Sequence, residues 1–140
     1  MATTREVTRA ASDLRVVLGQ LVRRLRAEHT LPISHGTVLG RLDRGGPATT
    51  SALAAAERVR PQSMAQTLAE LEADGLVDRT ADPTDGRRIL IGLTPEGRAV
   101  LAAERRRREG WLAQAIGDLD ADEQALLVRA VAVLRRLSES

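Results

Sequence analysis

The side chains best suited to specific chemistry lie in a short polar stretch near the middle of the chain: Arg60, Pro61, Gln62, Ser63 and Gln66. Gln62 and Gln66 are four residues apart, so on a helix their amides project from one face, one turn apart. A carboxamide can pair with adenine in the major groove of DNA or bridge to a base through water, and the Ser63 hydroxyl can contact a base or a phosphate. The spacing of these polar side chains predicts a surface that reads base edges.

Arg60 breaks a local rule of helix formation. Pro61 favours the first position of a helix, which puts Arg60 at the N-cap, where Ser, Thr or Asp would stabilise the helix. An arginine cannot cap a helix, so another interaction must favour it there. A phosphate contact is the interpretation we prefer, and a surface ion pair with Glu57 is the alternative.

A second basic site is expected on a loop further along the chain. Arg87 and Arg88 follow Asp85 and Gly86 in a stretch rich in turn-forming residues, between two segments with strand character. A guanidinium carried by a stiff loop tip suits the narrow, negative minor groove of DNA. The alternative is that both arginines are ordinary surface charges of a hairpin.

Composition argues against several other classes of protein. The chain of 140 residues has no cysteine and no lysine, which excludes disulfides, thiol redox sensing, a Schiff-base lysine and a P-loop lysine. His29 and His35 lack the spacing of metal ligands. We therefore expect neither an enzyme nor a metal or cofactor site. No apolar run is long enough to span a membrane and Met1–Arg9 is too polar for a signal peptide, which favours a soluble, cytoplasmic protein.

Net charge alone does not indicate a nucleic-acid partner. The whole chain carries +2, and residues 34–94, which hold both candidate sites, have seven arginines against eight acidic residues. The prediction of DNA binding therefore depends on where individual arginines lie, rather than on a broadly basic surface.

Apolar periodicity and capping signals predict the elements that position these side chains. Helices are expected at residues 6–29, 35–44 with Ser34 as N-cap, 51–57 capped by Thr49 or Thr50, 61–73 ending at Asp74-Gly75, 95–116 capped by Thr94, and 123–137. Strands are expected at residues 76–80 and 88–93, with a further very short strand at 48–50.

This order of elements is typical of a winged helix-turn-helix, in which the exposed helix enters the major groove and the hairpin reaches the neighbouring backbone or minor groove. The expected fold is mainly α with a small antiparallel β-wing, in a single domain spanning residues 1–140. Residues 34–94 form the predicted DNA-binding lobe.

Two of the predicted helices carry more apolar surface than one small domain covers. Heptad-spaced apolar residues run along residues 7–25 and again along residues 127–137. Part of each stripe is expected to pack within its own subunit and the remainder between two copies. The residues assigned to that contact are Leu14, Leu18, Leu21, Leu127 and Leu134.

Three motifs together resemble the MarR (multiple antibiotic resistance regulator) family. They occur in the family's order and spacing, and in this chain they are residues 68–79, Asp82-Pro83-Thr84-Asp85-Gly86-Arg87-Arg88, and Leu93-Thr94-Pro95-Glu96-Gly97. The resemblance implies a homodimer whose dimerisation helices come from residues 1–33 and 95–140. It also implies that Asp85 orients the wing and that Arg87 enters the minor groove.

The chain departs from the family pattern in two ways. The turn Glu57-Arg58-Val59 lacks the glycine common in helix-turn-helix motifs, and no cysteine is present for oxidant sensing. Many family members respond to small phenolic or anionic compounds, so a small-molecule effector is a possible partner, but the sequence does not indicate which residues would bind it.

The predicted function is therefore a sequence-specific DNA-binding transcriptional regulator, acting as a ligand-responsive repressor that binds a palindromic operator in double-stranded DNA as a homodimer. The alternative is a winged-helix protein-interaction module that does not bind DNA. The net charge of −1 over residues 34–94 mildly favours that alternative.

Overall fold

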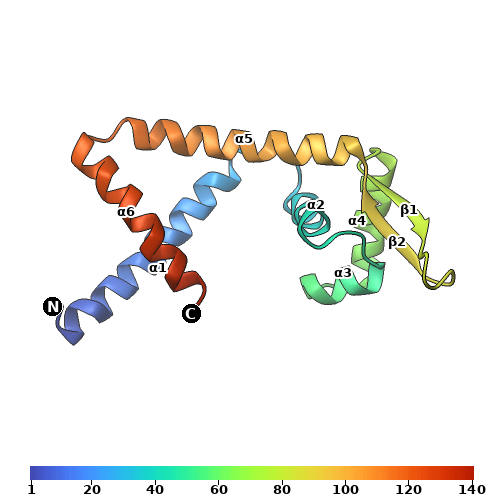
Figure 1. The fold of residues 1–140 in the computed structure, drawn as a ribbon, viewed down its shortest axis with the longest axis horizontal. Helices are drawn as coiled ribbons and strands as arrows, with labels where there is room; N and C mark the ends of the chain where they lie inside the picture. Colours follow the sequence, from blue (N-terminus) through green and yellow to red (C-terminus); the bar gives the residue numbers. More distant parts are fainter. The chain divides into compact units, whose positions relative to one another are not determined.

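A computed structural model describes all 140 residues as six helices and one two-stranded antiparallel sheet (Figure 1). The chain forms two compact units, Met1–Glu28 with Arg107–Ser140, and His29–Arg106. In chain order the elements are α1 (Thr4–Arg26), α2 (Ile33–Gly45), α3 (Thr50–Glu57), α4 (Pro61–Ala73), β1 (Val77–Ala81), β2 (Ile89–Leu93), α5 (Pro95–Gly117) and α6 (Ala121–Ser138).

The unit formed by His29–Arg106 has a continuous apolar core. Each of its elements buries one side: Leu39 from α2, Leu53 from α3, Leu68 and Leu71 from α4, and Ile91 from β2 are almost fully inaccessible to solvent. The spacing of Met64, Leu68 and Leu71 by four and three residues places them on one face of α4. The opposite face of this helix is therefore left exposed.

Local signals in the sequence set the turn between α3 and α4. The Thr49 hydroxyl accepts from the backbone N–H of Ala52 at 3.1 Å and caps α3, and Pro61 occupies the first turn of α4. Arg58 ends α3 in the left-handed conformation, with φ 55° and ψ 41°. An arginine therefore occupies the position at which a glycine would be unstrained.

The backbone at the start of α5 packs closely against the backbone that leads from α4 into β1. Thr94 donates from its hydroxyl to the Gly75 carbonyl at 2.6 Å and accepts from the Gly97 N–H at 3.0 Å, as predicted for a cap. A Cβ on Gly97 would lie 2.1 Å from the Leu76 carbonyl oxygen. The Leu-Thr-Pro-Glu-Gly motif therefore holds the start of α5 against the turn between α4 and β1.

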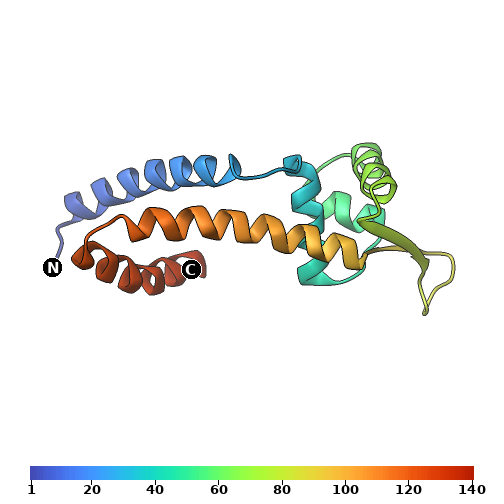
Figure 2. The same cartoon turned by 90° about the horizontal axis from the view of Figure 1, so that it is seen from above.

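The two strands pair antiparallel with Val77 opposite Leu93 and Ala81 opposite Ile89. The loop between them, residues 82–88, projects away from the helices of its own unit in both views (Figures 1 and 2). The fold of this unit is a winged helix, as predicted, with β1 and β2 as the wing.

Two local predictions were wrong. Ser34 does not cap α2, because the helix begins at Ile33 and Pro32 takes the N-cap; the Pro32 carbonyl accepts from the N–H groups of His35 and Gly36, both at 3.1 Å. The very short strand at residues 48–50 is only one bridge, between Ala48 and Ile91, because Thr49 and Thr50 begin α3 instead.

The unit formed by the two ends of the chain consists of α1, α6 and the second half of α5. Capping boxes begin both terminal helices, with Thr3 and Glu6 on α1 and Asp120 and Glu123 on α6. The Arg24 guanidinium lies 4.4 Å from the centre of the Trp111 ring, a cation–π contact between α1 and α5. None of the six helices is both long and apolar enough to cross a bilayer.

Neither terminal helix contains a buried residue. Of the residues assigned to a contact between copies, Leu14 and Leu134 are half-buried, while Leu18, Leu21 and Leu127 are exposed. An apolar groove runs between α1, α5 and α6 within this unit, lined by Leu21, Trp111, Leu112, Ala115, Ile116, Leu119, Leu127, Val128 and Val131.

Candidate nucleic-acid interface

The exposed face of α4 carries the polar residues predicted to read bases. Gln62, Ser63 and Gln66 are all exposed; Gln62 and Gln66 lie on the side of the helix away from Met64 and Leu68, and Ser63 lies on its flank. Gln62 and Ser63 lie in the first turn, where the helix N-terminus also favours a phosphate oxygen. The structure therefore brings these residues together on the accessible surface of the N-terminal half of α4.

Arg60 lies at the N-cap of α4, with extended backbone and no side-chain cap to the helix. It is exposed, and its guanidinium makes no ion pair or hydrogen bond. The alternative of a pair with Glu57 is wrong, because the Glu57 carboxylate accepts instead from Arg41 of α2. A free guanidinium beside the start of the exposed helix is suited to binding a phosphate.

The wing loop is shaped by its two aspartates. Asp82 accepts from the Thr84 N–H at 2.9 Å and from the Thr84 hydroxyl at 2.8 Å, and these bonds hold the pKa of the Asp82 carboxyl below its ordinary value. Asp85 accepts from the backbone N–H of Arg87 at 3.1 Å. Asp85 therefore contacts the backbone of the loop and leaves the Arg87 guanidinium unpaired.

Arg87 and Arg88 are both exposed on this loop. They lie on a different element from the glutamines of α4, within the same compact unit. The candidate interface thus has two parts, a polar helix face with Arg60 at its start and a basic loop carried by the sheet.

Acidic residues at the far end of α4 have partners that sequence reasoning missed. Glu70 accepts from Nε2 of His35, a buried residue of α2, at 2.7 Å. Glu72 accepts from Nε of Arg79 on β1 at 2.6 Å. No spacing along the chain pairs residues 35 and 70, so only the packing of α2 against α4 reveals the first contact.

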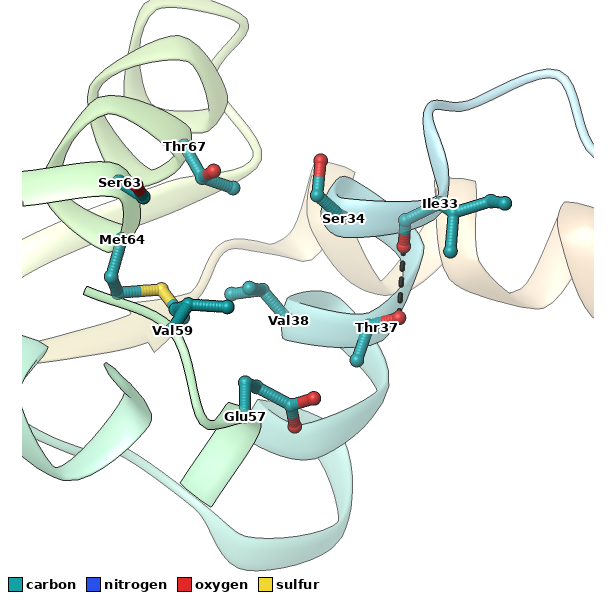
Figure 3. Close-up of a pocket in the computed structure, with 9 residues that line it drawn as sticks. All are labelled: Ile33, Ser34, Thr37, Val38, Glu57, Val59, Ser63, Met64 and Thr67. Carbon is teal, nitrogen blue, oxygen red and sulfur yellow. Dashed lines mark hydrogen bonds between the residues drawn. The ribbon is translucent and has the colours of Figure 1, made fainter. Parts of the chain in front are cut away.

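A cavity of about 330 Å³ lies behind the exposed helix, between α2, α4 and the turn that joins α3 to α4 (Figure 3). Its wall is mainly apolar, with hydroxyl groups at its edges; the Thr37 hydroxyl donates to the Ile33 carbonyl at 2.9 Å. The lining residues are Ile33, Ser34, Thr37, Val38, Glu57, Val59, Ser63, Met64 and Thr67. Ser63 therefore belongs both to this cavity and to the candidate interface.

Comparison with known proteins agrees with this geometry. The MarR family model matches residues 29–88, which covers α2 to the tip of the wing. An HTH-type transcriptional regulator of Mycobacterium leprae is 36% identical over 132 residues, covering 92% of each chain. The chain belongs to the MarR family. This MarR-family protein is a transcriptional regulator.

Solved structures share this fold over nearly the whole length of the chain. A crystal structure from Pseudomonas aeruginosa, assigned as a transcriptional regulator, is 42% identical with a TM-score of 0.82 and covers 99% of each chain. A Staphylococcus aureus MepR variant bound to an oligodeoxyribonucleotide is 20% identical, with a TM-score of 0.71 over 92% of this chain and 96% of that one. Bordetella bronchiseptica BpsR, whose DNA binding is regulated by 6-hydroxynicotinic acid, is 24% identical, with a TM-score of 0.59 over 93% of each chain.

Proposed function

We propose that this regulator binds double-stranded DNA sequence-specifically, with α4 in the major groove and the wing in the adjacent minor groove. The observation that carries the proposal is the exposed, polar face of α4, with Gln62, Ser63 and Gln66 accessible and an unpaired Arg60 at its start. The oligonucleotide bound by MepR, which has the same fold, supports it. Arg60, Pro61, Gln62, Ser63 and Gln66 would contact one groove, and Asp85, Arg87 and Arg88 would form the second contact.

The protein acts as a homodimer in this proposal. Exposed leucines and valines line α1 and α6, neither of which buries a residue within one chain. Such apolar surface is costly to leave in water, and a second copy would cover it through the same residues on both sides. Residues 1–33 and 95–140 would supply the dimerisation helices, and residues 34–94 the DNA-binding lobe. A twofold dimer places two recognition helices on a palindromic operator.

A small-molecule effector is the further part of the proposal. The regulation of BpsR by 6-hydroxynicotinic acid shows that this fold accommodates such control in another protein. Here the cavity behind α4 is large enough for a compact ring compound, and its wall includes Ser63 and the turn that sets the start of α4. We propose that a ligand there would move α4 relative to α2 and weaken DNA binding, and that the protein acts as a ligand-responsive repressor.

The experiment compares the wing with the recognition helix. Arg87→Ala removes the reach of the wing into the minor groove, where contacts sense width more than base identity. It should weaken binding to the operator and to unrelated DNA alike, and reduce the salt dependence of binding. Gln62→Ala leaves phosphate contacts intact and should relax preference at one position of each half-site, by about 1–3 kcal/mol of discrimination.

Circular dichroism of each variant controls for misfolding. If Arg87→Ala, Gln62→Ala and Gln66→Ala all bind the operator as the unsubstituted protein does, the helix and wing are wrongly assigned as the interface. A winged-helix module that binds another protein instead of DNA would then be the better description.

A further inference from the structure

Two hydrogen bonds connect buried His35, through Glu70, to Gln66 on the face of α4 proposed to read DNA. Buried His35, with 7% of its surface exposed, contacts one carboxylate oxygen of Glu70 through Nε2 at 2.7 Å. Gln66 donates from its amide nitrogen to the other carboxylate oxygen, at a long 3.5 Å. Both oxygens of Glu70 are therefore engaged, one by α2 and one by a candidate base-reading side chain.

The chemistry of the carboxylate determines which end of the Gln66 amide faces Glu70. An ionised carboxylate only accepts hydrogen bonds, so the group of Gln66 that faces Glu70 must be its NH₂ and not its carbonyl. A position four residues away on a helix is also close enough for such a contact. The amide oxygen of Gln66 is then turned away from Glu70.

The Glu70 carboxylate is held in position by buried His35. Its side chain is half exposed, whereas the His35 side chain is 9% exposed and packed in α2, so the histidine cannot follow a moving carboxylate into solvent. The short bond to His35 therefore limits the rotamers that Glu70 can adopt, and through Glu70 those of Gln66.

We infer that Glu70, anchored by His35, is a positioning residue that sets the base preference of Gln66. With its oxygen outward, Gln66 accepts from the amino groups that adenine and cytosine present in the major groove. Guanine and thymine present acceptors at the corresponding position, so this orientation disfavours them. The inference rests on the proposed function, since it assigns a preference to the DNA-reading face of α4.

The test uses the full-length protein and the operator that it selects from random DNA. The position read by Gln66 is the one where Gln66→Ala flattens base preference. There, Glu70→Gln should reduce the preference for adenine or cytosine over guanine or thymine by roughly three- to tenfold, because a neutral amide can donate or accept and no longer fixes the Gln66 amide. His35→Leu should reduce it in the same direction.

Glu72→Gln is the matched control. This substitution also removes one negative charge from the C-terminal end of α4. In the unsubstituted protein, however, the Glu72 carboxylate contacts Arg79 and not Gln66. Both variants should raise affinity for unrelated DNA to a similar extent by removing a negative charge. Only Glu70→Gln should change the base preference at the Gln66 position, and it should change nothing further when Gln66→Ala is already present.

The outcomes separate the inference from its premise. An unchanged preference in Glu70→Gln overturns the positioning role, as does an equal flattening in Glu72→Gln or an effect of Glu70→Gln that persists in the Gln66→Ala background. Circular dichroism and urea unfolding detect a purely structural effect, which would lower stability without altering the ratio of affinities between bases. If the unsubstituted protein shows no sequence preference at all, the proposed function itself fails, and this inference with it.

Discussion

Gly97→Ala should destabilise the winged-helix unit strongly although it adds a single methyl group. Gly97 is buried in the first turn of α5, where that helix crosses the chain at Leu76. The added Cβ would lie 2.1 Å from the Leu76 carbonyl oxygen and 3.2 Å from a methyl carbon of Leu93. The Leu76 atom is backbone and accepts from the Thr94 N–H at 3.1 Å, so it cannot rotate out of the way.

The size of the effect follows from the movement required. Real Cβ atoms essentially never approach other heavy atoms closer than 3.0 Å, so α5 and the turn at Leu76 must separate by at least the difference from 2.1 Å, which is 0.9 Å. Overpacking of this kind costs about 1–3 kcal/mol. The separation also strains the bonds that Thr94 makes to Gly75 and Leu76, each worth about 1 kcal/mol. We expect a total loss of about 1–5 kcal/mol, depending on how far the two bonds are weakened.

Urea unfolding followed by circular dichroism, at one fixed protein concentration, measures this loss. Gly36→Ala is the matched control, because a Cβ there meets nothing within 4 Å inside helix α2. The control should be neutral or more stable by up to about 1 kcal/mol, since alanine favours a helix over glycine. A Gly97→Ala variant as stable as the unsubstituted protein would refute the close packing of α5 against Leu76.

Three further predictions concern the turn, the dimer and the wing. Arg58→Gly should stabilise the protein by about 0.5–1 kcal/mol in thermal or urea unfolding, because it relieves a left-handed arginine, while Arg58→Ala keeps that conformation and should be near neutral. Leu18→Glu should shift sedimentation toward monomer, because it would place a carboxylate in the apolar contact of the proposed dimer, whereas Gln20→Glu on another side of α1 should not; a dimer unchanged by Leu18→Glu would exclude Leu18 from the contact. Because the pKa of Asp82 is lowered in the folded state, its bonds to Thr84 should contribute at pH values above its unfolded pKa and be lost as pH falls through the lower, folded value. The amide NMR signal of Thr84 should therefore be unchanged at neutral pH and shift only in acid, and Asp82→Ala should abolish the acid shift.

The fold was predictable because its signals are local. Thr49, Pro61 and Thr94 act within one turn of their own helix, and the apolar spacing along α4 repeats within a few residues. Ser34 was misassigned because Pro32 is equally able to begin a helix, and two adjacent candidates cannot be ranked from propensity alone.

The candidate site was predictable in its members but not in their interactions. Side-chain type and spacing place Gln62 and Gln66 on one exposed face, and those inferences need no tertiary structure. The contact of His35 with Glu70 joins residues 35 positions apart, and the pairing of Glu57 with Arg41 rather than Arg60 depends on how α2 lies against α3. Such contacts are determined by packing, which no periodicity along the chain records.

The most direct test of DNA reading by this MarR-family protein is selection of bound fragments from random double-stranded DNA with the unsubstituted full-length protein. We expect one enriched motif, an inverted repeat whose half-site centres lie about ten base pairs apart, because the proposed twofold dimer would present its two α4 helices to one side of the duplex. Affinity for that motif should exceed affinity for a scrambled version at the same salt concentration. Recovery of no motif, with equal binding to selected and scrambled DNA, would contradict sequence-specific recognition by α4 and the wing.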